Sequence, residues 1–157
     1  MSEELIRLAV VLASSTVATM GIVMMFGIER RVLLWALLSS LICCGSYEIT
    51  IMLGGSLLVA SMIASALTAA YSDVMAHWLK VPATVMIIPG IVPLVPGGKL
   101  YYTMLGAVSS DMEMFSVYGK EALLGAAGIA IGIVAVTAVS RPLNAKIAEL
   151  RERKAKN

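Results

Sequence analysis

The chain has 157 residues, of which 59% are hydrophobic and only 14% are charged, and its mean hydropathy is +0.91. An average soluble domain carries about 25% charged residues, so this composition excludes an ordinary soluble domain. Long apolar runs place the chain in a lipid bilayer instead. The net charge of +2 is small.

Five apolar segments follow one another along the chain. They cover residues 5–28, 32–46, 51–71, 82–110 and 117–139, and the second is expected to extend through residue 47 because it is short for a span. Polar connections separate them at residues 29–31, 47–48, 72–80 and 111–120. We therefore expect an all-α membrane protein of five transmembrane helices, with one transmembrane domain over residues 1–140 and a basic cytoplasmic tail over residues 141–157.

The distribution of basic residues predicts the orientation. Six of the twelve Lys and Arg residues lie in the tail: Arg141, Lys146, Arg151, Arg153, Lys154 and Lys156. With five spans and a cytoplasmic C-terminus, Arg30, Arg31 and Lys80 also fall inside, whereas only Arg7 and Lys120 fall outside. The bias predicts an N-terminus outside and a tail that faces anionic headgroups. No aromatic or groove-reading motif accompanies the tail, so we expect no nucleic-acid partner.

The fourth segment is interrupted. Between Pro82 and Lys99 the chain reads P-A-T-V-M-I-I-P-G-I-V-P-L-V-P-G-G-K. As a continuous helix, residues 82–110 would reach roughly 43 Å, against a hydrocarbon core of about 30 Å. The segment is either unwound in its middle or a re-entrant loop. Because lipid offers no hydrogen bonds, broken backbone must be surrounded by protein or by a polar cavity.

The residues of this break predict a site for an anionic or zwitterionic solute. Pro89, Pro93 and Pro96 lack N–H groups, and Gly90, Gly97 and Gly98 permit turns. If a helix restarts near Gly97, its free amides carry the positive end of the helix dipole and attract a carboxylate. Lys99 adds a full charge. The alternative is a Pro-kinked helix with Lys99 snorkelling to the interface.

Polar residues after the break are further candidates. The hydroxyls of Tyr101, Tyr102 and Thr103 could bind a solute, although an interfacial aromatic belt explains the tyrosines equally well. Asp111 and Glu113 are proton-coupling candidates if they face the bundle interior, and solvated loop charges if they do not. Thr84, before the break, is a weaker binding candidate.

Other chemistry is not expected. Cys43 and Cys44 are helix neighbours that point about 100° apart, so a packing role fits them better than a disulfide. His77 is the only histidine, and with Glu48 and Asp73 it lies in a predicted connection. We expect no metal, no cofactor and no enzyme activity, because neither a nucleophile with an aligned base nor a pair of intramembrane acids is evident.

Small residues predict close helix packing. Gly128 and Gly132 form a G-x-x-x-G spacing in the last segment, and Ser61, Ser65 and Ala69 form one stripe on the third. Such surfaces allow two helices to approach closely and say little about chemistry.

Three blocks resemble the threonine/serine exporter superfamily. The run I-P-G-I-V-P-L-V-P-G-G-K-L-Y-Y-T-M at residues 88–104 resembles its signature, and residues 26–36, 109–111 and 120–126 are similar to further blocks. The chain looks like the small five-span subunit of a split exporter. The resemblance puts functional weight on break and helix-restart residues, less securely on Asp111, and most safely on Pro89, Gly90, Pro93, Pro96, Gly97, Tyr101 and Met104. The family usually has Asn and then Pro where this chain has Gly27 and Glu29. The resemblance does not extend to Lys99, whose expected role rests on its location alone.

The resemblance implies a bacterial or archaeal cytoplasmic-membrane exporter of small amino acids, or of a dicarboxylate such as succinate, that works with a larger homologous subunit. An odd number of spans would make two such halves inverted repeats. No G-x-x-x-x-G-K-[ST] motif occurs, so a gradient-driven secondary transporter is expected. The alternative is a non-transporting structural or assembly subunit, and higher oligomers are possible in either case.

Overall fold

A computed structural model describes the backbone of residues 2–155 and the side chains of residues 6–29 and 31–140. The helices are α1 (Ser2–Met25), α2 (Arg30–Met52), α3 (Leu57–Leu79), α4 (Thr84–Ile91), the 3-10 turn η1 (Val92–Leu94), α5 (Gly97–Val108) and α6 (Met112–Ala155). No strand occurs within residues 2–155, so the expected all-α class is confirmed. The side chains of the basic tail lie outside the described residues, and its boundary at residue 140 stays a prediction.

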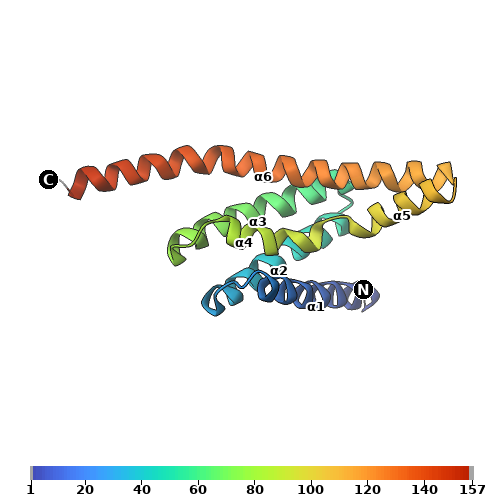
Figure 1. The fold of residues 1–157 in the computed structure, drawn as a ribbon, viewed down its shortest axis with the longest axis horizontal. Helices are drawn as coiled ribbons and strands as arrows, with labels where there is room; N and C mark the ends of the chain where they lie inside the picture. The colour runs from blue at the N-terminus through green and yellow to red at the C-terminus, as the bar shows by residue number, and fades with distance from the viewer. Residues whose placement is uncertain (1, 156–157) are drawn as a thin grey trace.

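Successive helices run in opposite directions. In Figure 1, α1, α3 and α6 run one way, α2 and the α4–α5 pair run the other, and the two termini lie at opposite ends. The helix α3 packs between α2 and α6, while α1 covers the other side of α2. Among the described residues, four helices are long and apolar enough to cross a membrane, and the bent α4–α5 pair makes a fifth span if it is counted as one.

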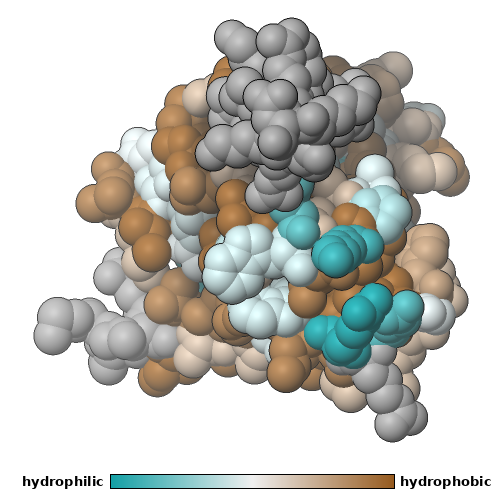
Figure 2. Space-filling view, turned by 90° about the vertical axis from the view of Figure 1, so that its left-hand side faces the viewer, coloured by the Kyte–Doolittle hydropathy of each residue, from teal (hydrophilic) through white to brown (hydrophobic). Residues whose placement is uncertain are grey.

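The surface and the interior have the polarity of a membrane protein. Large apolar side chains face outward, as at Val17 (73% exposed) and Leu123 (73% exposed). The interior is built from small and hydroxyl-bearing residues, including the fully buried Ala64, Ser65 and Thr68 of α3. Figure 2 shows brown, hydrophobic atoms around the sides of the molecule, with teal residues gathered at one end. Lipid therefore replaces water as the solvent of the outward faces.

The turn between α2 and α3 lies later in the chain than expected. Gly54 adopts a positive φ of 83°, and the Ser56 hydroxyl accepts a hydrogen bond from the Val59 amide at 3.4 Å, which caps α3. The predicted connection at residues 47–48 was wrong, because Tyr47 and Glu48 lie inside α2. The predicted connection at residues 72–80 was also wrong, because α3 continues to Leu79.

The last connection is shorter than expected. The helix α6 already begins at Met112, and the Asp111 carboxylate accepts a hydrogen bond from the Met114 amide at 3.0 Å. An acid at this position satisfies a free amide and complements the helix dipole. The predicted connection at residues 111–120 is therefore reduced to a short turn, and α6 continues unbroken past Ser140 to Ala155.

The two small-residue surfaces pack against each other, as the sequence pattern indicates. A Cβ atom at Gly128 would lie 2.5 Å from the Leu58 carbonyl oxygen, and one at Gly132 would lie 2.4 Å from the Met62 carbonyl oxygen and 2.1 Å from Ser65 Oγ. All three distances are shorter than a Cβ contact allows. The close packing of α3 on α6 therefore requires glycine at both positions.

The predicted break is present. The α4–η1 segment and α5 are bent by 53°, and α5 continues toward the opposite end of the bundle (Figure 1), so the pair crosses the bundle instead of turning back. Pro93 has no N–H to donate to the Pro89 carbonyl one turn earlier. Thr19 of α1 donates to that carbonyl oxygen at 3.4 Å. A neighbouring helix thus satisfies a backbone group that proline releases.

The buried glycine of α4, just before the break, yields a first prediction. A Cβ at Gly90 would lie 2.3 Å from Ser39 Oγ, which is itself 3.2 Å from Ser72 Oγ. Gly90→Ala should destabilise the fold by on the order of 2 kcal/mol through overpacking. In the double variant Gly90→Ala/Ser39→Ala, part of this stability should be restored, because Ser39→Ala removes Oγ, the nearest overlapping atom. Thermal unfolding of the two single variants and the double variant measures the coupling, and strictly additive losses would contradict the contact.

Candidate functional site

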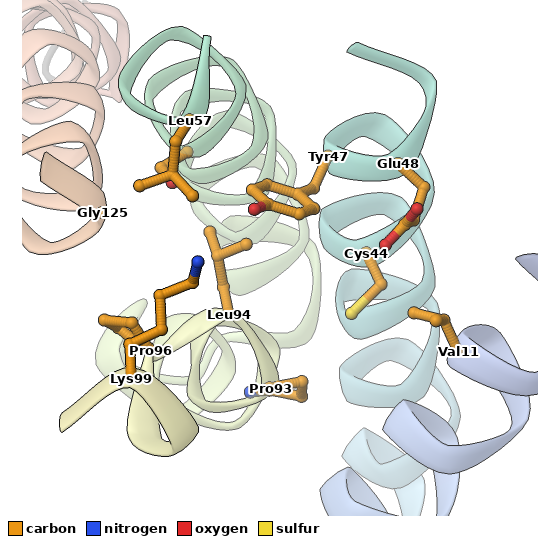
Figure 3. A pocket seen from close by; sticks show the side chains of 11 residues that line it. Val11, Cys44, Tyr47, Glu48, Leu57, Pro93, Leu94, Pro96, Lys99 and Gly125 are labelled. Atoms are coloured by element: carbon orange, nitrogen blue, oxygen red, sulfur yellow. The ribbon is translucent and has the colours of Figure 1, made fainter. Parts of the chain in front are cut away.

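A cavity of about 190 Å³ lies beside the break. Its walls come from α1, α2, α3, η1, α5 and α6 (Figure 3), and its lining residues are Val11, Cys44, Tyr47, Glu48, Leu57, Ser61, Pro93, Leu94, Pro96, Lys99 and Gly125. A water molecule needs only about 15 Å³ of such volume, so the space can hold a small solute. Its lining combines charged residues with residues of the break.

The break forms one wall of this cavity. Pro93 and Pro96 fix the backbone on either side of Leu94, and helix α5 restarts at Gly97. In the first turn of a helix the N–H groups have no carbonyl partner in a preceding turn, and they carry the positive end of the dipole. The sequence predicts such a restart, and the structure places it at the cavity edge.

Lys99 extends from this first turn into the cavity. In Figure 3 its amine points toward the space between Leu57 and Tyr47. The amine donates to the Glu121 carboxylate of α6, and the two side chains are 35% and 41% exposed. The ion pair is thus partly accessible, which leaves room for another anion to compete for the amine.

Glu48 supplies a carboxylate from α2, on the other side of the cavity (Figure 3). Its side chain is only 8% exposed, and its nearest cation is Arg7, whose Nε lies 3.9 Å from Oε2. That separation is longer than a hydrogen bond. Because the Arg7 side chain is 68% exposed, it compensates the buried carboxylate only weakly.

The sequence interpretation missed Glu48 because it placed the residue in a loop. The available signal was an acid in a stretch that continues with helical apolar spacing, from Val32 to Met52. An ionisable residue inside a membrane span is a functional-site hypothesis by default.

Tyr47 lies between the two charged groups. Its ring comes from α2 beside Glu48, and its hydroxyl points into the cavity toward Leu57 and Lys99 (Figure 3). The phenol lies within electrostatic range of Lys99, Glu48, Arg7 and Glu121. The cavity therefore contains a hydroxyl as well as groups of both charges.

The predicted site residues divide into those on the cavity and those away from it. Pro93, Pro96 and Lys99 line it. Pro89 and Gly90 are buried one turn earlier, where Gly90 lies against α2 and α3. A Cβ at Gly97 or Gly98 would meet nothing within 4 Å, so open space adjoins the start of α5.

Tyr101, Tyr102 and Thr103 lie outside the cavity. Tyr101 is 61% exposed, and the Tyr102 ring stacks on Tyr118 with centroids 5.0 Å apart. Thr103 Oγ1 donates to the Lys99 carbonyl oxygen at 2.7 Å. Their predicted roles in binding stay predictions.

The proton-coupling candidates Asp111 and Glu113 are both exposed and lie at the start of α6. Asp111 caps the helix, as described above. Their predicted role in proton coupling stays a prediction. Across the described side chains, no group of three His, Cys, Asp or Glu residues is arranged to hold a metal ion.

A second cavity of about 160 Å³ adjoins the other face of α4. It is lined by Phe26, Ile28, Thr84, Val85, Ile88 and Pro89. Thr84, the weaker candidate from the sequence, contributes its only polar side chain. Without a charged group this space offers little to orient a small polar solute.

Comparison with known proteins identifies the family of the chain. The family model described as "Threonine/Serine exporter, ThrE" matches residues 11–139, which include the break and every residue that lines the cavity. No curated protein and no solved structure matches the chain. The matched range covers most of the 157 residues, and the chain therefore belongs to the threonine/serine exporter family.

Proposed function

We propose that this chain is the membrane subunit of a secondary exporter of small carboxylate-bearing solutes, and that the cavity beside the break is its substrate site. The candidates are threonine- or serine-type amino acids and a dicarboxylate such as succinate. The observation that carries the proposal is a cavity inside an apolar bundle whose wall is a broken helix and whose lining includes Lys99 and Glu48. Interrupted membrane helices place amides and charges where substrates bind.

The arrangement of the bundle supports a position for the site between the two membrane faces. The break lies between α4 and α5, partway along a pair that crosses the bundle (Figure 1). Lipid cannot satisfy the freed backbone groups at that depth, whereas a polar cavity with solute or water can.

The basic residues support the proposed orientation. The start of α2, which contains Arg30, and the α3–α4 turn, which contains Lys80, lie at the same end of the bundle (Figure 1). The positive-inside rule assigns this end to the cytoplasm of a bacterial or archaeal cell, with the N-terminus outside. A proton or ion gradient would drive export, with Asp111 and Glu113 as coupling candidates.

A larger homologous subunit is the proposed partner. With the α4–α5 pair counted as one span, the described residues make five crossings. An odd number of crossings supports ends on opposite membrane faces, which suits one half of an inverted pair. The odd number of crossings supports a partner of this kind. The test is co-purification of the chain with the product of a neighbouring gene, if that product carries a complementary Pro-Gly pattern.

Counterflow of labelled serine, threonine and succinate in liposomes tests transport, with the full chain alone and with that partner. Gly125→Leu should reduce flux about tenfold or more, because a side chain there fills the cavity while its Cβ meets Pro96 and Leu57 at ordinary distances of 3.5 and 3.6 Å. Gly21→Leu is the matched control, since a Cβ at Gly21 on α1 meets nothing within 4 Å.

Equal flux in Gly125→Leu and Gly21→Leu would show that the solute does not pass through the cavity. Absence of counterflow in every preparation, with the complex intact, would instead favour the alternative of a structural or assembly subunit.

A further inference from the structure

The cavity carries opposite charges on different elements. Glu48 comes from α2 and Lys99 from the start of α5, with the Tyr47 hydroxyl between them (Figure 3). Neither charge has an ideal partner of its own. Glu48 is buried yet has only a cation at 3.9 Å, and Lys99 pairs with a carboxylate that is 41% exposed. Both groups are thus poised to accept a charged ligand.

We propose that Glu48 and Lys99 form the two ends of a zwitterion site, which selects α-amino acids against dicarboxylates. This inference rests on the function proposed above. Lys99 binds the substrate carboxylate, while Glu48 binds the ammonium group. Charge-assisted hydrogen bonds are short, and they are strong where the surrounding protein has a low dielectric constant.

The same geometry acts against a dicarboxylate. With one carboxylate on Lys99, the second would lie toward Glu48, where like charges repel across a buried space. Like-charge juxtaposition at an interface is a strong element of specificity because it penalises the wrong ligand directly. Arg7 offsets this repulsion only weakly because its side chain is 68% exposed.

Glu121 acts in this scheme as an internal substitute for the substrate carboxylate. In the structure its carboxylate accepts the Lys99 hydrogen bond. A substrate that binds the Lys99 amine must displace the Glu121 carboxylate from it. Removal of the Glu121 charge should therefore strengthen substrate binding, in contrast to removal of the Glu48 charge.

The closing experiment compares Glu48→Gln and Glu121→Gln in the counterflow assay with L-serine and with succinate. Glu48→Gln should lower the ratio of serine flux to succinate flux by about tenfold or more. Glu121→Gln should lower the half-saturating serine concentration by roughly threefold to tenfold. Glu29→Gln is the matched control, because Glu29 is exposed, pairs with Arg31 and does not line the cavity.

Ligand-dependent thermal stabilisation of the purified protein separates this inference from the transport proposal. Serine should stabilise the wild-type protein, succinate should not, and Glu48→Gln should reverse this preference. If the wild-type protein transports serine and Glu48→Gln leaves the ratio of serine flux to succinate flux unchanged, the zwitterion site is wrong and the transport proposal is unaffected. If the predicted pattern of thermal stabilisation is observed but no preparation shows flux, the transport proposal is wrong and the zwitterion site is retained. Failure of both serine flux and serine stabilisation in wild type overturns both.

Discussion

The double variant Gly128→Ala/Gly132→Ala is expected to lose on the order of 4 kcal/mol of unfolding free energy. The added Cβ atoms would overlap the carbonyl oxygens of Leu58 and Met62, which are backbone atoms of α3 and cannot rotate away. The two helices must then separate along their whole contact. In a bilayer, close packing is the main force between helices, because lipid is as apolar as the side chains it replaces. Thermal unfolding in detergent, followed by circular dichroism, measures the loss.

Gly119→Ala is the matched control on the same helix. A Cβ there would meet the nearest atom, Thr103 Cγ2, at an ordinary 3.4 Å. Alanine should then be neutral or stabilising by up to about 1 kcal/mol, since it forms helices better than glycine. If the double variant unfolds at the same temperature as this control, α3 and α6 do not pack as the structure describes.

Lys99→Gln is expected to reduce flux of every tested carboxylate by about tenfold or more. The substitution keeps a hydrogen-bonding side chain of similar length and removes the only cation among the residues that line the cavity. It should raise the half-saturating concentration for serine and for succinate alike, because the carboxylate is common to both. Counterflow measured over a range of solute concentrations gives these half-saturating concentrations.

Two further variants separate binding from a purely structural role. Lys120→Gln removes an exposed cation of α6 that does not line the cavity, and it should leave flux unchanged. Lys99→Gln/Glu121→Gln removes both partners of the ion pair. If Lys99 served only to neutralise Glu121, the double variant would regain wild-type flux, and that recovery would contradict a role in substrate binding.

The sequence alone predicted the class of the protein and the position of its irregular segment. The apolar runs are long enough to span a bilayer. Pro93 and Pro96 lack the N–H groups that would continue the helix, so the break at residues 92–96 depends on local chemistry, whereas Pro89 is accommodated inside α4. The small residues on the third and fifth segments likewise predicted packing surfaces, because only such residues allow backbones to come within van der Waals contact.

Helix ends were harder to predict where polar residues are sparse. Glu48, Asp73 and His77 resemble loop residues in a hydropathy profile, yet α2 and α3 continue through them. A helix satisfies its own backbone hydrogen bonds, so one charged side chain does not end it. Such a residue requires polar groups around it, and these come from segments that are distant in the sequence but adjacent in the fold.

The cavity was therefore decided by the tertiary structure. Lys99 was a candidate from its place at the helix restart, but its partner Glu121 lies 22 positions later in the chain, and Glu48 lies on a different helix. Local pattern specifies which face of each helix is apolar, and it does not specify which helix faces which. Only the packing of α2, α3 and α6 around the break brought a buried carboxylate, a hydroxyl and an amine to one small space, because charge and shape complementarity arise between segments and not within them.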